Sequence, residues 1–187
     1  GEFAECLEGI KEASEFLNYP VVSGNVSFYN GTNKKNIYPT PVIGAVGLIS
    51  NVEKKINHIL KEEGNPVLLV GKTFGHLYQS TFFEEIYSIN EGPPPEVNLL
   101  NEKNNGEFIL KIIKENIVNS VHDVSSGGLI VALAEMCLGS ELGIKIEKPK
   151  KLKNLFEYFY GEDQGRYLIE VDKNNLKKVE KLFKNNN

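Results

Sequence analysis

Apolar residues follow two different periods along the first 50 residues. One stripe recurs every three or four positions, at Phe3, Leu7, Ile10, Ala13 and Leu17. This spacing predicts an amphipathic helix over residues 3–17, which ends before Pro20 because proline has no amide hydrogen to donate. Short apolar runs at 21–22 and 42–49 predict strands, and the polar segment at 30–36 is typical of a hairpin or an exposed loop. These elements are too few to close a hydrophobic core alone.

After a polar segment at residues 51–65, which is the best candidate for a domain boundary, predicted strands and helices alternate. Apolar runs predict strands at 66–71, 119–123, 143–146 and 166–171. Helical spacing predicts helices at about 76–87, 99–116, 129–138, 152–160 and 174–184. The helix at 129–138 is so apolar that we expect it to be almost entirely buried. This alternation predicts a layered α/β domain over residues 66–187, with no internal repeat.

Composition narrows the class of protein. Of 187 residues, 41% are apolar and 25% are charged, which excludes a disordered or low-complexity chain. The net charge is −4 and Arg166 is the single arginine, which argues against nucleic-acid binding. Cys6 and Cys137 lie in helical patterns and read as free thiols. With no basic leader and no apolar run near the roughly 20 residues that span a bilayer, we expect no membrane contact and a cytoplasmic location.

The first candidate site follows the predicted strand at 21–22. Gly24 leaves the backbone open to a polyanion because no Cβ stands in the way. Asn25 offers an amide oxygen, a hard ligand suited to Mg²⁺ beside phosphate oxygens. Ser27 points to the same side of an extended chain and can donate a hydrogen bond to a substrate oxygen. Taken alone, such a short motif is more often a polar turn.

Two further candidate sites lie in the second half of the chain. His122–Gly128 reads HDVSSGG, and small residues at a helix start expose amides that attract phosphate. Asp123 there is placed equally well to bind Mg²⁺ or to cap the helix. Gly161–Arg166 reads GEDQGR, where a lone arginine in a lysine-rich chain suggests a need for its planar guanidinium. A structural ion pair accounts for Arg166 at least as well.

Several of these motifs resemble one family. VVSGNVSFYN and IYPTPVIGAVGLI resemble the second half of the small-type synthetase subunit of the phosphoribosylformylglycinamidine synthase family. SVHDVSSGGLIVALAEM and YGEDQGRYLIEV are similar to later segments of the same half, so the resemblance covers essentially the whole chain. It implies a layered mixed sheet with helices over residues 56–187, like the C-terminal domain of aminoimidazole-ribonucleotide synthetase. Residues 1–55 would be the tail of an α+β N-terminal-type domain. We also expect the C-terminal-type domain to be truncated and the chain to be a fragment.

The resemblance implies an ATP-dependent C–N ligase of purine biosynthesis. The family converts formylglycinamide ribonucleotide, ATP and glutamine-derived ammonia into formylglycinamidine ribonucleotide, ADP and phosphate. By position, Gly24 would contact ATP, Asn25 would bind Mg²⁺ and Ser27 would contact the nucleotide substrate. The implied partners are the remainder of the synthetase chain, a glutaminase subunit and a small bridging subunit. This part would supply one wall of a composite site and be inactive alone.

The sequence departs from the family pattern in the second half. The family's E-S-Q-x-R reads EDQGR at residues 162–166, and its substrate-binding version belongs to the other half of the duplicated protein. The catalytic copy of the metal-binding aspartate that Asp123 matches also lies there. We therefore keep Asp123, Glu162, Gln164 and Arg166 as secondary candidates. Two other functions stay open: a non-catalytic scaffold that binds a structural nucleotide or a partner subunit, and a sibling ATP-dependent synthetase.

Overall fold

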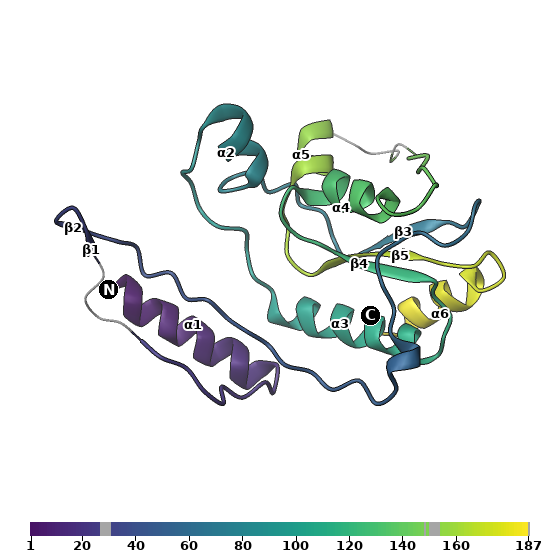
Figure 1. Ribbon diagram of the computed structural model, residues 1–187, viewed down its shortest axis with the longest axis horizontal. Coiled ribbons are helices and arrows are strands. Elements are labelled where there is room, and N and C mark those ends of the chain that lie inside the picture. Colours follow the sequence, from purple (N-terminus) through teal and green to yellow (C-terminus); the bar gives the residue numbers. More distant parts are fainter. Residues whose placement is uncertain (27–30, 148, 150–153, 187) are drawn as a thin grey trace. The chain divides into compact units, whose positions relative to one another are not determined.

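The computed structural model describes residues 1–26, 31–147, 149 and 154–186, and it divides into two compact units, Gly1–Ser50 and Asn51–Asn187 (Figure 1). None of the helices within these ranges is long and apolar enough to cross a bilayer.

The first unit contains one helix and one small hairpin. Helix α1 spans Glu2–Phe16, which confirms the predicted amphipathic helix. Strands β1 (Gly31–Thr32) and β2 (Lys35–Asn36) pair antiparallel, which confirms the hairpin in the polar segment. The Tyr19 hydroxyl donates to the carbonyl oxygen of Val46 at 2.6 Å. No described residue of this unit is buried.

The strands predicted at 21–22 and 42–49 are not formed, so these two predictions are wrong. Val42, Val46 and Leu48 are 91%, 86% and 100% exposed. A strand needs a neighbouring strand for its amide and carbonyl groups, and the described part of this unit offers only the two-residue hairpin. The apolar run therefore stays extended and exposed.

The second unit is built on a three-stranded sheet. Its strands are β3 (Val67–Val70), β4 (Ser120–Val124) and β5 (Arg166–Glu170), in the spatial order β3-β5-β4. Leu168 of β5 lies opposite Leu69 on one side and His122 on the other, and both strand pairs are antiparallel. The predicted α/β class is confirmed. The parallel pair that a mixed sheet would add does not occur among the described strands.

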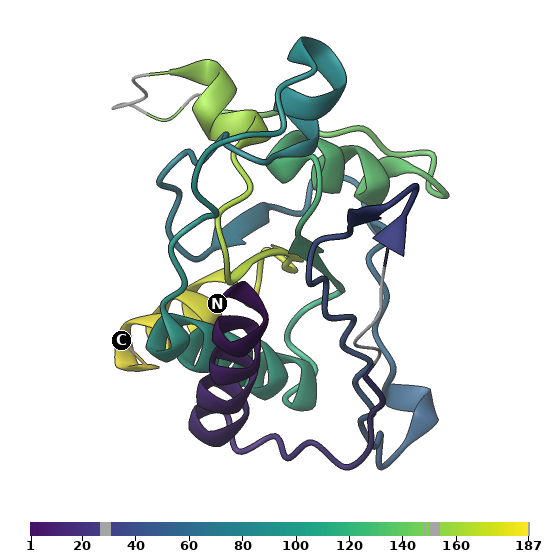
Figure 2. The ribbon, with the colours of Figure 1, turned by 90° about the vertical axis from the view of Figure 1, so that its left-hand side faces the viewer.

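Helices cover both faces of this sheet (Figures 1 and 2). Helices α3 (Leu99–Lys114) and α6 (Leu176–Asn186) cover one face, and α4 (Gly128–Cys137) and α5 (Leu155–Tyr160) cover the other. Side chains alternate across a strand, so Ile169 of β5 enters the core beneath α3 while Leu168 enters the core beneath α4. Two hydrophobic cores result.

Three further predictions about the second unit need correction. The helix predicted at 76–87 is only α2, Thr81–Tyr87. Ser80 caps the start of this helix, and the loop before it is bonded to another segment of the chain. No strand forms at 143–146. Helix α4 buries Leu129 and Leu133, but Val131 and Leu138 are 36% and 69% exposed, since only one side of this helix faces the sheet.

The polar segment at 51–65 contains a short 3₁₀ helix, η1, at Val52–Lys54. The helix predicted at 152–160 begins at Leu155, and residues 152 and 153 lie outside the described residues.

Candidate functional site

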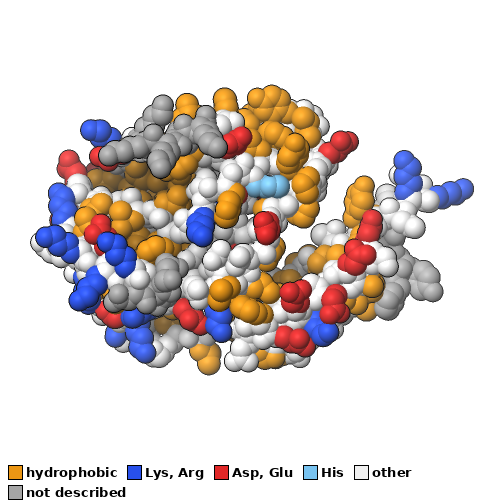
Figure 3. All heavy atoms as spheres, turned by 180° about the vertical axis from the view of Figure 1, so that it is seen from behind, with side chains coloured by type: hydrophobic (Ala, Val, Ile, Leu, Met, Phe, Trp, Pro, Cys, Tyr) orange, Lys and Arg blue, Asp and Glu red, His pale blue; other side chains and the backbone are white. Residues whose placement is uncertain are grey.

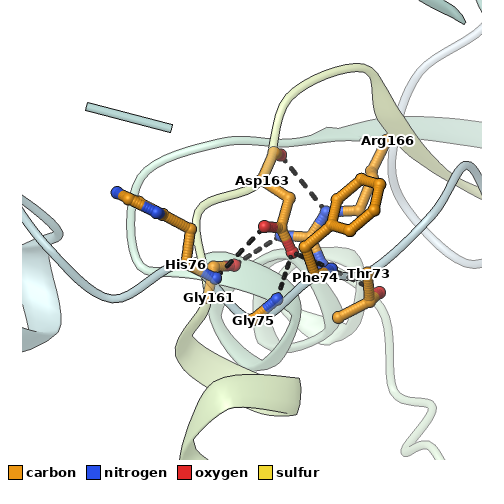
Figure 4. Close-up of polar contacts among 7 residues, drawn as sticks. All are labelled: Thr73, Phe74, Gly75, His76, Gly161, Asp163 and Arg166. Carbon is orange, nitrogen blue, oxygen red and sulfur yellow. Dashed lines mark hydrogen bonds and ion pairs between the residues drawn. The ribbon is translucent and has the colours of Figure 1, made fainter. Parts of the chain in front are cut away.

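The loop between α5 and β5, residues 161–165, holds the loop that follows β3. The buried carboxylate of Asp163 accepts hydrogen bonds from the amides of Phe74 and Gly75, both at 2.9 Å, and from the amide of His76 at 3.1 Å (Figure 4). Three successive amides on one carboxylate bring two distant segments together. The cost of burying the charge is offset by these bonds and by an ion pair, 3.8 Å long, with Arg166.

Arg166 lies inside the fold, 1% exposed. Its Nε donates to the carbonyl oxygen of Asp163 at 3.2 Å, its Nη1 to Thr73 Oγ1 at 3.3 Å, and its Nη2 to the carbonyl oxygen of Gly161. Burial lowers the pKa of Arg166, and the negative charge of Asp163 opposes this shift. All three donating nitrogens are therefore used within the protein, and the flat, forked guanidinium is what lets one side chain reach three separate acceptors.

Glu162 connects the starts of two helices. Its Oε1 accepts from the amide of Gly127, directly before α4, at 2.7 Å and from the amide of Thr81, the first residue of α2, at 2.8 Å. Its own amide donates to the carbonyl oxygen of His76 at 2.9 Å. Gln164, two residues on, is exposed. Glu162 therefore acts as an internal anion at positions where the helix ends favour negative charge.

The HDVSSGG segment forms the end of β4 and the turn into α4. The amide of Gly128 donates to the carbonyl oxygen of Ser125 at 3.0 Å, and Glu162 occupies the amide of Gly127. Two of the amides expected to attract phosphate are thus already bonded within the protein. The Asp123 side chain is 67% exposed and is not the cap of α4, because the N-cap residue of this helix is Gly127.

His122, the residue before Asp123, lies close to two carboxylates. Its Nε2 lies 2.9 Å from Glu135 Oε2 and its Nδ1 lies 3.4 Å from Asp123 Oδ1. The rings of His122 and His58 are 4.9 Å apart at their centroids. Within the described residues, no set of three or more His, Cys, Asp or Glu side chains is arranged to hold a metal ion.

The first candidate motif lies in the first unit, apart in sequence from all the others. Gly24 and Asn25 are exposed in an irregular segment, and a Cβ built on Gly24 would meet no atom within 4 Å. Ser27 lies outside the described residues.

Sequence reasoning missed the roles of two acidic residues. Asp163 belongs to the GEDQGR motif, but it was not among the candidate residues. Glu170, the last residue of β5, is fully buried and accepts from the amides of Lys61 and Glu62 at 2.9 and 3.1 Å, from Asn65 Nδ2 at 3.0 Å and from Ser120 Oγ at 3.0 Å. The signal that could have found it is an acid at the end of an otherwise apolar strand, which must have partners when buried.

A small sheet covered by helices on both faces, with its loops tied by internal carboxylates, defines this chain as a layered α/β domain preceded by a separate small unit. Residues 62–187 match the family described as AIR synthase related protein, C-terminal domain, and the chain belongs to this family.

Curated relatives extend the similarity over the whole chain. A protein of Pelagibacter ubique named phosphoribosylformylglycinamidine synthase subunit PurL is 52% identical over 186 residues, covering 100% of this chain and 26% of that protein. A protein of the same name from Parvibaculum lavamentivorans is 44% identical over 179 residues, covering 95% of this chain and 24% of its own length. The chain spans about a quarter of the length of these relatives.

Solved structures share the fold. Thermotoga maritima PurL complexed with FGAR matches 72% of this chain and 24% of its own, with a TM-score of 0.60 and 16% identity. The ATP complex of the same protein covers 72% of this chain and 22% of its own, with a TM-score of 0.54 and 14% identity. At such identities the likeness concerns the fold alone.

Proposed function

We propose that this chain is part of a phosphoribosylformylglycinamidine synthase, the ligase that converts formylglycinamide ribonucleotide, ATP and ammonia into formylglycinamidine ribonucleotide, ADP and phosphate. The observation that carries the proposal is the 52% identity over 186 residues to a relative of that name. The match includes both units of the chain. The reaction belongs to purine biosynthesis, which we expect in the cytoplasm.

Within this function, we assign the candidate site of the first unit to the reactants. Gly24 contacts ATP, Asn25 binds Mg²⁺ and Ser27 contacts the nucleotide substrate. The open surroundings of Gly24 and the exposure of Asn25 support this assignment, because a ligand can reach both. Asn25 fits Mg²⁺ as a donor of one hard oxygen. The remaining ligands must come from phosphate, water and other parts of the protein, since Mg²⁺ prefers six oxygens.

The chain then supplies one wall of a composite site. Residues 1–55 are assigned to an N-terminal-type domain and residues 56–187 to a C-terminal-type domain. The other walls belong to the remainder of the synthetase, and the ammonia comes from a glutaminase subunit joined through a small bridging subunit. Asp123 and Gln164 stay available to solvent for a supporting contact.

A chimeric enzyme tests the proposed activity. The matching quarter of the Pelagibacter ubique relative is replaced by this chain, and ADP and amidine formation are measured with formylglycinamide ribonucleotide, ATP and ammonium. We expect ATP-dependent amidine formation, whereas the relative lacking that quarter should have none. A chimera that melts cooperatively yet forms no amidine would contradict the proposal.

Two variants in the chimera separate the assigned roles. Asn25→Ala removes a metal ligand, so turnover should fall by orders of magnitude and recover partly at raised Mg²⁺. Ser27→Ala should weaken substrate binding by about 0.5–1.5 kcal/mol for a neutral hydrogen bond, or about 1.5–3 for one to a charged group, with unchanged Mg²⁺ dependence. Asn36→Ala, at an exposed position of the hairpin, is the matched control and should leave the kinetics unchanged. Lost thermal stability with normal kinetics would make the motif a structural turn.

A non-catalytic scaffold is the second candidate function. It is favoured by the internal use of Glu162, Asp163 and Arg166, which leaves these polar groups bonded within the protein. The same chimera distinguishes it. Under the scaffold hypothesis, Asn25→Ala and Ser27→Ala leave turnover unchanged, while assembly with the partner subunits still depends on the presence of this quarter.

A further inference from the structure

A cavity of about 310 Å³ lies in the second unit, beside the loop that Asp163 holds. It is lined by the loop at residues 74–78, by Phe83 of α2 and by Glu157 of α5. Seen from behind, hydrophobic side chains gather over the α2 region (Figure 3). The cavity lies at the lower end of the size range of small-molecule sites.

The loop that lines the cavity directs its hydrogen-bond donors elsewhere. The amides of Phe74, Gly75 and His76 all donate to the carboxylate of Asp163 (Figure 4). His76 Nε2 lies 3.0 Å from the carbonyl oxygen of Pro93, which can only accept a hydrogen bond. This nitrogen therefore carries a proton and donates it in a hydrogen bond to Pro93. An anion entering the cavity would compete for donors that are already bonded.

The other side chains of the lining are apolar, three of them aromatic and one the aliphatic Leu77, together with the acid Glu157. Phe74 is 77% exposed and Tyr78 is 51% exposed. The ring of Tyr78 is held edge-on against His76, with centroids 6.0 Å apart, and against Phe83, at 5.8 Å. Glu157 is the only acidic or basic residue of the lining apart from His76, and no described residue gives its carboxylate a hydrogen bond or an ion pair.

Close backbone packing holds this arrangement. A Cβ on Gly75 would lie 2.5 Å from Glu157 Cβ, and one on Gly92 would lie 2.4 Å from the ring of Tyr78. The ring of Tyr78 is therefore packed against Gly92, and the start of the Glu157 side chain is packed against Gly75, at glycines that leave no room for a larger residue. Because the ring of Tyr78 is already held by its neighbours, it loses little conformational freedom when a ligand binds, which favours affinity.

We propose that this cavity binds an organic ammonium group carried on a small apolar body, with Glu157 as its counter-ion and the faces of Phe74 and Tyr78 around it. Aromatic faces attract cations electrostatically, and a carboxylate at the same place adds charge attraction. The ligand is a free small molecule, because the cavity is larger than one lysine side chain needs. The proposal stands apart from the ligase activity.

The test uses choline and its uncharged isostere 3,3-dimethylbutan-1-ol as probes. Each is titrated into the ¹⁵N-labelled chain at low ionic strength, and the amide shifts of Gly75 and Tyr78 are followed. We expect saturable shifts with choline in the millimolar range and at least about fivefold weaker binding of the alcohol. Glu157→Gln and Tyr78→Leu should each weaken choline by a similar factor, while Glu85→Gln, an exposed acid of α2 outside the lining, should not.

Two results would overturn the proposal. One is equal binding of choline and the alcohol, which would mean an apolar site without charge recognition. The other is the absence of any shift at these amides while the spectrum remains that of a folded protein. Nα-acetyl-lysine N-methylamide checks the source of the ammonium group: weaker binding than choline supports a free ligand, and tighter binding would replace it with a lysine of a partner protein.

Discussion

Acidic side chains buried in the second unit accept hydrogen bonds from the backbone of the same chain. Asp163 accepts from three amides and pairs with Arg166, and Glu170 accepts from two amides and two side chains. Each joins segments that are about 90 to 110 residues apart in sequence. At the residue scale, the loops of this domain are positioned by carboxylates, so single substitutions at these residues should have large effects on stability.

Arg166→Met should lower the free energy of unfolding by about 3–5 kcal/mol, because it leaves the buried charge of Asp163 without its cation. Equilibrium urea denaturation of the variant and the parent chain measures the change. Lys178→Gln is the control, since it breaks an exposed ion pair with Glu115, 3.0 Å long, that should be worth less than about 1 kcal/mol. Equal losses in the two variants would contradict an internal role for Arg166.

Ionisation of Tyr167 should lower the free energy of unfolding of the chain at alkaline pH. Burial raises the pKa of Tyr167 above its ordinary value of 10.0, and the negative charges of Glu102 and Asp123 raise it further. The unfolded chain therefore loses this proton at a lower pH than the folded chain, so the free energy of unfolding falls as the pH rises above about 10.

The measurement is the difference in the free energy of unfolding between the parent chain and Tyr167→Phe at several pH values. This difference should be constant below about pH 10 and should shift in favour of the phenylalanine variant above it. Tyr38→Phe, at an 85% exposed position, controls for the loss of a hydroxyl. A difference that does not change with pH would show that the hydroxyl of Tyr167 ionises alike in both states.

At the scale of elements, α2 and α4 depend on one side chain for their first turns. The carboxylate of Glu162 receives the amides of Thr81 and Gly127, at 2.8 and 2.7 Å. Ser80 adds a side-chain cap to α2, whereas α4 has no side-chain cap of its own. The start of α4 should therefore be more sensitive to Glu162 than the start of α2.

Glu162→Gln keeps an acceptor oxygen but removes the charge, so the two bonds should weaken from charged to neutral strength, a loss of about 2 kcal/mol together. Hydrogen exchange of the Gly127 and Thr81 amides measures this directly, and protection should fall at both, most at Gly127. Glu107→Gln, an exposed acid of α3, should change neither amide. Unchanged protection at Gly127 would contradict the bridging role.

At the scale of the whole molecule, the two units differ in how far they can stabilise themselves. Both hydrophobic cores are formed by residues of the second unit, and the described residues of the first unit include none that is buried. A chain lacking residues 1–50 should therefore melt within about 3 °C of the full chain, equivalent to roughly 1 kcal/mol. Circular dichroism melts of both chains measure this, and a much lower midpoint for the shorter chain would contradict it.

The chain by itself should not form product. It spans about a quarter of its relatives, and the proposed site needs contacts to nucleotide and phosphate from the rest of the protein, so transition-state stabilisation is incomplete. Amidine formation by the isolated chain should equal that of a sample without protein, with the chimera as positive control. Turnover comparable to the chimera would overturn the composite-site assignment.

The sequence by itself determined the elements whose periodicity is strong and whose partners lie within the chain. Helices α1 and α3, the hairpin and strands β3, β4 and β5 form close to where the pattern predicted them. The family resemblance also came from the sequence, because motifs such as SGNVSFYN and HDVSSGG are contiguous and can be recognised without a structure. Local propensity and short-range spacing are sufficient for these features.

Only the tertiary structure decided which apolar runs pair and what the polar motifs contact. The run at 42–49 has the composition of a strand but lies without a partner strand in the described part of its unit. Leu138 is exposed although Leu133 and Met136 of α4 are buried. Glu162 and Arg166 were secondary candidates for ligand binding. The fold instead joins Glu162 to amides 35 and 81 residues away, and Arg166 to the hydroxyl of Thr73, 93 residues away. Hydrogen bonds and burial depend on which distant segments meet, and no local pattern carries that information.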